Sequence, residues 1–173
     1  MKKSKRLYPL LLTLFIVATD QLTKNWIVSH IPVNTVGYSF FGGFLDIVHV
    51  RNNAVAFSLG SSLSLAMRTA LFIVLPLLVL AYIGYLVVST RNNDLSSFYR
   101  WIFAAFLGGG IGNVFDRIFR HFQVVDFMQN RVYGLFGLEY WPVWNFADAS
   151  IVIAGTLFIL HVLYHLMKDK ENK

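Results

Sequence analysis

The chain has 173 residues, of which 56% are hydrophobic and only 14% are charged, and its mean hydropathy is +0.57. A soluble domain carries about 25% charged residues, so the apolar excess predicts burial in lipid, and the length suits one domain. The absence of cysteine excludes thiol nucleophiles, disulfides, iron–sulfur clusters and thiolate zinc sites. The net charge of +6 does not indicate nucleic acid, because lysine and arginine gather at the chain ends and in one short loop.

Four largely apolar segments predict membrane-spanning helices, at about residues 8–28, 65–89, 99–118 and 146–167. The first follows the charged start MKKSKR and resembles a secretory signal peptide, but it lacks a small-residue cleavage site and is interpreted as a retained helix. Pro76 is expected to kink the second helix. The chain is therefore expected to form one all-α integral membrane domain, a bundle of four transmembrane helices over residues 1–173.

An even number of spans places both chain ends on one side of the membrane. The positive-inside rule makes that side cytoplasmic, because basic residues gather near those ends of the spans. They are Lys2, Lys3, Lys5, Arg6, Arg91, Arg100, Lys168, Lys170 and Lys173. The two long connections, about residues 29–64 and 119–145, then lie outside. The first is rich in β-branched and aromatic residues, so we expect a small extracytoplasmic β-element there.

The unusual polar residues converge near the outer face in this topology. They are Asp20, Lys24, Asn52, Asn53, Asn113, Asp116, Arg117, Asp126, Asn145 and Asp148. Ionisable groups in or beside membrane spans are costly, and they mark either function or obligatory pairing. Two carboxylates around one water can hydrolyse a peptide bond without metal or thiol, because close like charges share a single proton. The ionised carboxylate then takes a proton from the water, and the protonated one hydrogen-bonds the carbonyl oxygen.

Five sequence blocks occur in order along the chain. They are D-Q-L-T-K (20–24), R-N-N-A-V-A-F (51–57), G-G-G-I-G-N-V-F-D-R (108–117), V-V-D-F (124–127) and P-V-W-N-F-A-D (142–148). Together they resemble the signature blocks of the lipoprotein signal peptidase family, signal peptidase II. The resemblance implies four helices in the bacterial inner membrane, both termini cytoplasmic, and cleavage of prolipoproteins just before a cysteine that carries diacylglycerol.

The resemblance also implies roles for individual positions. It assigns the catalytic pair to Asp126 and Asp148. The residues that orient the pair or bind substrate would be Asn52, Asn113, Arg117 and Asn145, and the structural polar residues would be Asp20, Lys24 and Asp116. One block departs from the family pattern N-x-G-A-A-F, because Ala54 and Val55 stand at its glycine and first alanine. This difference affects the expected shape of the outer loop.

The partners follow from the same resemblance. A lipidated prolipoprotein and membrane lipids are expected, with neither a metal nor an organic cofactor, and the working form is expected to be a monomer that binds no nucleic acid. The outer segment around Phe41–Phe57 is hypothesised to clamp the substrate. Its acyl chains would lie along the bundle.

Simpler interpretations of the two aspartates stay open. Asp126 could pair with Arg120 or Arg131 in an outer loop, since structural ion pairs also fill clefts. Asp148 could be an ordinary acidic residue in the first turn of a helix, where the helix dipole favours it. For the pair Asp20 and Lys24, spaced i, i+4 on one helix face, a structural role is favoured over catalysis.

Three further motifs are given structural roles. The glycine cluster Gly108–Gly112 lacks the lysine of a phosphate-binding loop and is expected to let helices pack closely. His161 and His165 have the spacing of a zinc site but lack its glutamate, so packing is favoured. Ser58 and Ser150 have no lysine or histidine partner, which argues against a serine peptidase.

The rival interpretation from another class of function is a proton-coupled transporter or channel that uses the same acidic residues as a relay. A transporter spreads polar groups through the depth of the bilayer and often carries internal repeats. Here the polar residues cluster at one face and no repeat is visible. A peptidase is therefore favoured.

Overall fold

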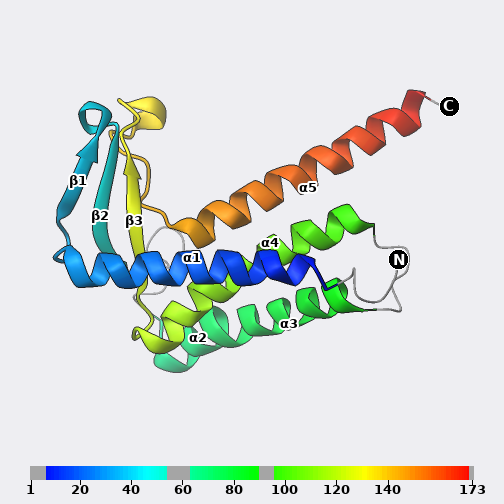
Figure 1. The fold of residues 1–173 in the computed structure, drawn as a ribbon, viewed down its shortest axis with the longest axis horizontal. Coiled ribbons are helices and arrows are strands. Elements are labelled where there is room, and N and C mark those ends of the chain that lie inside the picture. Colours follow the sequence, from blue (N-terminus) through cyan, green and yellow to red (C-terminus); the bar gives the residue numbers. More distant parts are fainter. Residues whose placement is uncertain (1–6, 54–62, 90–95, 172–173) are drawn as a thin grey trace.

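The computed structural model describes residues 7–53, 63–89 and 96–171, and it contains a helical bundle with a small sheet at one end (Figure 1). The helical segments are α1 (Pro9–His30), α2 (Leu65–Thr69) continuing into α3 (Leu75–Val88), α4 (Ser97–Phe119) and α5 (Phe146–Glu171). Each lies within a few residues of a predicted helix. α1 begins and α5 ends at the end of the bundle opposite the sheet.

Three helical stretches in the described part of the chain are long and apolar enough to cross a membrane. They are Leu65–Val88, Ser97–Phe119 and Phe146–Lys170. α1 is 22 residues long, but Asp20 and Lys24 interrupt its apolar sequence. The prediction of four spanning helices is therefore confirmed for three of them only.

Small residues on α4 let it pack closely against α1. A Cβ atom added at Gly108 would lie 2.9 Å from the Cβ of Ile16, and one at Gly112 would lie 2.7 Å from a carboxylate oxygen of Asp20. Any larger residue would push α1 away from α4. The glycine cluster therefore packs helices, as predicted, and at Gly112 it brings a charged side chain against the α4 backbone.

Pro76 is the second residue of α3, and a π-helical turn, Ala70–Val74, joins α2 to α3 just before it. A proline lacks an N–H group, and its ring clashes with the carbonyl four residues earlier in an α-helix. A wider π turn removes this clash, and such turns are common at irregular points of helices. The expected kink at Pro76 thus takes the form of a local change in helix type.

The sheet has three antiparallel strands in the order β1 (Val36–Phe40), β2 (Leu45–Asn52) and β3 (Val124–Asn130). β1 and β2 form the hairpin predicted in the first outer segment. β3 comes from the second outer segment and was not predicted. Its buried Val125 and Phe127 pack on Ile27 and Ile31 at the end of α1, so the sheet is fixed directly to the bundle.

Two basic or titratable residues at the opposite end have structural contacts. Arg100, predicted as a cytoplasmic charge, is buried, and its guanidinium donates hydrogen bonds to the carbonyls of Leu86 and Val87 at the end of α3. It therefore caps that helix. The ring of His161 packs against Phe98 with 4.3 Å between centroids, which agrees with the packing role favoured for it.

Candidate active site

Asp126 and Asp148 belong to two segments that the backbone holds side by side. Asp126 lies on β3, and Asp148 lies in the first turn of α5. The carbonyl of Trp144, just before α5, accepts hydrogen bonds from the N–H groups of Phe127 (3.1 Å) and Met128 (2.8 Å) on β3. These bonds bring the start of α5 to the strand that carries Asp126.

Asn145 links the two carboxylates. Its Nδ2 donates to Oδ1 of Asp126 at 2.7 Å, and its backbone N–H donates to Oδ2 of Asp148 at 3.2 Å. The N–H of Asp148 donates in return to Oδ1 of Asn145 at 2.9 Å. The last two bonds form a reciprocal cap at the N-terminus of α5. One residue therefore fixes both aspartates through the local geometry of a helix start.

Asn52 and Asn113 complete the set of amide donors around the pair. Asn52, at the end of β2, donates from Nδ2 to Oδ2 of Asp126 at 2.9 Å. Asn113, on α4, donates from Nδ2 to Oδ1 of Asp148 at 2.7 Å. Its Oδ1 accepts from Nδ2 of Asn145 at 3.2 Å. The three predicted asparagines thus surround the predicted catalytic pair, and they come from three separate segments of the chain.

The simpler interpretation of Asp126 as a partner of an outer-loop arginine does not match its contacts. Arg120 pairs with Asp116, and Arg131 pairs with Glu139 at 2.6 Å. Asp126 instead accepts from amide groups, with only 3% of its surface exposed. Burial raises the pKa of Asp126 from its ordinary 3.8 to about 6, opposed by the Asn52 hydrogen bond and assisted by repulsion from Asp148. A shared proton on the pair is therefore favoured at mildly acidic pH.

Lys24 is the centre of a buried ionic cluster beneath the aspartates. Its ammonium group lies 2.8 Å from Asp20 and 3.0 Å from Asp116, and all three side chains are fully buried. It also donates to Oδ1 of Asn113 at 3.1 Å. One cation thus neutralises two carboxylates and orients an asparagine that contacts Asp148.

The same cluster fixes the backbone next to each candidate catalytic residue. Oδ1 of Asp20 accepts the N–H of Ala147 at 3.1 Å, one residue before Asp148. Oδ2 of Asp116 accepts the N–H of Val125 at 3.1 Å, one residue before Asp126. The cluster therefore positions both aspartates through the backbone, and nothing in the sequence pattern indicated these two bonds, one across 127 residues and one across nine.

Two further polar residues border the cluster. Gln21 was not predicted as a site residue, yet its side-chain amide nitrogen, Nε2, donates to Asp20 (3.1 Å) and to Asp116 (3.0 Å). Arg117 donates from Nη1 to the carbonyl of Asn113 at 3.1 Å and interacts electrostatically with both Asp148 and Asp126. The signal that could have identified Gln21 is its place between Asp20 and Lys24 in the block D-Q-L-T-K.

Apolar grooves reach the candidate site from the side of the bundle. One, of about 290 Å³, is lined by Trp141, Trp144, Asp148, Ala149, Val152 and Ile153. A larger one, of about 500 Å³, lies between α1, α4 and α5 and shares Ala149 and Ile153 with the first. Asp148 is therefore accessible along a surface suited to hydrocarbon. Trp141 and Trp144 were not predicted as part of the site.

Replacing Asn145 by serine tests the bridge between the carboxylates. Serine keeps an oxygen that caps α5, but it removes the Nδ2 donor to Asp126. We expect any activity that depends on the pair to fall about 10²-fold through misplacement of Asp126, as measured by initial rates. Ser96→Ala is the matched control: it removes the cap of α4 and should lower thermal stability without changing the rate. Equal rates in Asn145→Ser and the wild type would contradict the bridging role.

The sequence model of one protein family, described as Signal peptidase (SPase) II, matches residues 12–164. Curated relatives named lipoprotein signal peptidase include those of Borrelia hermsii, 38% identical over 90% of this chain and 89% of the relative, and Borrelia turicatae, 40% identical over 86% and 85%. The relative in Borreliella burgdorferi is 36% identical over 92% of each chain.

Solved structures give a similar result. A bacterial membrane enzyme solved by the in meso method at 2.3 Å resolution has a TM-score of 0.74 and 27% identity, covering 96% of this chain and 91% of the other. A second, at 1.9 Å, has a TM-score of 0.72 and 27% identity over 90% and 92%. The similarity therefore extends over nearly the whole fold.

Proposed function

Because the chain belongs to the signal peptidase II family, we propose that it removes signal peptides from lipid-modified prolipoproteins by an aspartic mechanism at Asp126 and Asp148. The observation that carries the proposal is the bridge through Asn145, which joins Asp126 to Asp148, a residue that lines an apolar groove. A hydrogen-bonded pair of carboxylates, with Asp126 buried and Asp148 lining the groove, matches the requirement for activating one water without a metal.

The proposed reaction divides the work between the two aspartates. Asp148 lies in the first turn of α5 and lines the apolar groove, so in the proposed reaction it is the base that takes a proton from the attacking water. Asp126 carries the shared proton and donates a hydrogen bond to the carbonyl oxygen of the scissile bond. The water oxygen bonds to the carbonyl carbon, the C–N bond breaks, and the leaving nitrogen receives a proton. The products are a carboxylate and an amine.

We further propose that α1 is the fourth membrane span. One face of α1 is buried through Thr13, Asp20 and Lys24, while Leu14 and Leu22 are more than 60% exposed on the other. Polar groups turned inward and apolar groups turned outward suit a helix in lipid. Four spans place both termini on one side, which the positive-inside rule makes the cytoplasm of a bacterial inner membrane, with the aspartates near the outer face.

The apolar grooves support a substrate that arrives from the bilayer. Both grooves are bordered by α5, where Val152, Ile153 and Leu157 are exposed, and they share Ala149 and Ile153 close to Asp148. A diacylglyceryl chain or an apolar signal helix could therefore stay in lipid while the peptide bond reaches the aspartates. The proposed working unit is a single chain, since every residue of the site comes from one copy. The hypothesised clamp falls partly on residues 54–57, including Ala54 and Val55, which lie outside the described residues.

The arrangement gives less support to a proton relay. Within the described residues, the buried acidic side chains are Asp20, Asp46, Asp116 and Asp126, and they lie near the sheet. A relay needs titratable groups through the depth of the membrane.

One assay separates the two functions. Purified protein in detergent is incubated with a prolipoprotein that carries diacylglycerol on its cysteine, and in parallel with the unmodified precursor. Release of the signal peptide from the lipidated form only is expected. A protein that cleaves neither form, yet conducts protons when reconstituted in vesicles, would replace the proposal with the rival function.

The rate of cleavage should depend on the protonation of Asp126. Its pKa of about 6 means that the protonated form is lost as pH rises through that value. We therefore expect kcat/KM to fall about tenfold per pH unit above about pH 6. In Asn52→Ala, the hydrogen bond that lowers this pKa is absent, so the descending limb should move to higher pH. Identical profiles for the two proteins would contradict Asp126 as the proton donor.

A further inference from the structure

The connection between β3 and α5 folds into a compact hairpin, Arg131–Trp141, referred to here as the tip hairpin. Its two arms are joined by backbone hydrogen bonds from Val132 to Glu139 (2.9 Å) and from Trp141 to Asn130 (2.8 Å). Six large apolar or aromatic side chains in it are at least 40% exposed: Tyr133, Leu135, Phe136, Leu138, Tyr140 and Trp141. An exposed apolar patch of this kind marks contact with lipid or another molecule.

The backbone of the tip hairpin holds aromatic residues in a conformation that favours glycine. Phe136 has a φ of 55° and Tyr133 a φ of 51°, both in the left-handed region. Phe136 is nevertheless 79% exposed and Tyr133 63% exposed. Within the described structure, the Phe136 ring gains little packing from its neighbours because most of its surface is exposed. A benefit that offsets the backbone strain must therefore come from outside the chain.

The charges of the tip hairpin are neutralised within it. Arg131 forms an ion pair with Glu139 at 2.6 Å, and its guanidinium lies over the rings of Tyr133 (5.3 Å) and Tyr140 (5.8 Å). The hairpin thus presents aromatic and aliphatic groups around one paired arginine. This composition suits the interface between lipid headgroups and hydrocarbon, where tyrosine, tryptophan and arginine concentrate.

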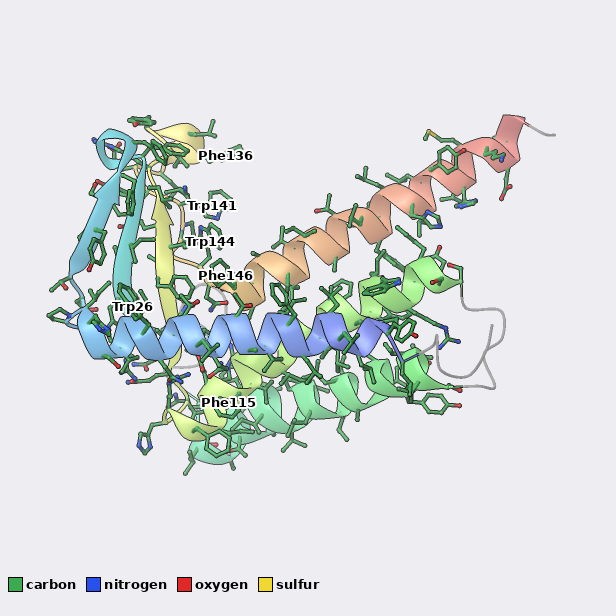
Figure 2. The ribbon with its side chains drawn as sticks, in the orientation of Figure 1. Trp26, Phe115, Phe136, Trp141, Trp144 and Phe146 are labelled. Atoms are coloured by element: carbon green, nitrogen blue, oxygen red, sulfur yellow. The ribbon has the colours of Figure 1, made fainter. Side chains whose placement is uncertain are left out.

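The position of the tip hairpin connects it to the lipid-facing side of the bundle. Figure 2 shows Phe136, Trp141, Trp144 and Phe146 one after another, from the tip down to the start of α5. Trp141 and Trp144 line the same groove as Val152 of α5, which is 66% exposed in an apolar helix. The aromatic row is therefore continuous with a surface that faces lipid.

We propose that the tip hairpin inserts into the outer leaflet beside α5 and acts as an interfacial anchor for the sheet. The hairpin continues β3 directly, so its depth in the bilayer sets the height of Asp126 above the hydrocarbon. The anchor would keep the aspartates at the level where a lipid-tethered bond emerges. The insertion itself follows from the membrane topology and does not depend on the proposed cleavage.

Depth measurements test the anchor directly. The chain contains no cysteine, so Phe136→Cys and Val36→Cys give single labelling sites, the second an exposed position on the opposite edge strand β1. Each is labelled with an environment-sensitive fluorophore in phosphatidylcholine–phosphatidylglycerol vesicles. Lipids brominated near the headgroup should quench position 136 several-fold more than position 36, and aqueous iodide should do the reverse. Equal quenching at both sites would overturn the proposal, as would protection of position 136 from both quenchers, which indicates a protein partner.

A second variant separates membrane contact from folding. Phe136→Gly relieves the left-handed strain, so its melting temperature in detergent should equal or exceed that of the wild type. Its rate of signal-peptide release should match the wild type in micelles and fall several-fold in vesicles. An equal loss in both media, or none in vesicles, would contradict an anchor that sets the depth of Asp126. The quenching result stands whether or not cleavage is observed.

Discussion

Asp126→Asn and Asp148→Asn are each expected to reduce signal-peptide release by at least about 10³-fold, because each removes one proton-transfer group of the pair. Asparagine preserves the shape of the side chain and can still accept hydrogen bonds through Oδ1. In Asp126→Asn, the side chain can still accept a hydrogen bond from Asn52 or Asn145, so the position of residue 126 and of its asparagine partners should not change. Release is followed by gel shift with the lipidated precursor.

The folded state of Asp126→Asn should be at least as stable as that of the wild type at neutral pH. The raised pKa of Asp126 means that its stabilising contribution is fully present below about pH 3.8 and is lost as pH rises through about 6. The difference between the ordinary pKa of 3.8 and the raised pKa of about 6 corresponds to roughly 3 kcal/mol of unfolding free energy. Asparagine does not ionise, so the variant should melt higher than the wild type at pH 7, with the difference shrinking toward pH 4.

Asp46→Asn is the matched control for these variants. Asp46 is a buried acidic residue of the same sheet, but it accepts a hydrogen bond from Ser39 Oγ at 2.6 Å on the strand pair away from Asp148. Its replacement should leave the release rate near the wild-type value. Near wild-type release by Asp126→Asn or Asp148→Asn would rule out the aspartic mechanism, whereas an equal loss in all three variants would indicate general damage to the sheet.

Hydropathy predicted the helices well because lipid imposes a length and a composition on each span. The segments predicted at about residues 65–89, 99–118 and 146–167 correspond to helices that meet the requirement for a span. α1 formed as predicted, but its buried face carries Asp20 and Lys24, so its membrane role cannot be judged from hydropathy alone. The hairpin of β1 and β2 was also visible, because a run of β-branched residues is a local signal.

The parts of the site that could not be predicted depend on long-range pairing. β3 pairs with β2 across more than seventy residues of sequence, as in the partners Val50 and Asp126, and no local pattern indicates such a partner. No sequence pattern predicts the hydrogen bonds from the N–H of Ala147 to Asp20 and from the N–H of Val125 to Asp116 either. The residue types in the sequence identified most polar residues of the site, but only the fold shows which of them form hydrogen bonds with one another.

These connections give the polar residues different relations to the chemistry. Asn52 and Asn145 touch Asp126 directly, and a change in them alters hydrogen bonds at a reacting carboxylate. Asp20 and Asp116 act one step away, through the backbone that precedes each catalytic candidate. Replacing the first group should change the pH profile, whereas replacing the second should change stability and rate together.

Lys24→Met is expected to destabilise the protein more than any other single substitution in the bundle. Lys24 is the shared cation of Asp20 and Asp116, and all three side chains have no exposed surface. Removing one partner of a buried ion pair leaves an uncompensated charge and costs about 3–5 kcal/mol. Thermal unfolding in detergent should show a large drop in the melting temperature, while Lys168→Met, at the exposed end of α5, should show almost none.

Second-site substitutions reveal which of the two carboxylates, Asp20 or Asp116, is destabilising when Lys24 is removed. Asp116 keeps an ion pair with Arg120 when Lys24 is replaced, but the other hydrogen bonds that Asp20 accepts come from neutral groups, Gln21 and the N–H of Ala147. Adding Asp20→Asn to Lys24→Met should therefore restore more stability than adding Asp116→Asn, because asparagine at position 20 can still accept the N–H of Ala147. If both second substitutions restore the same stability, or if neither restores any, Lys24 does not act by neutralising Asp20. That result would contradict the role of Lys24 in positioning the two catalytic candidates.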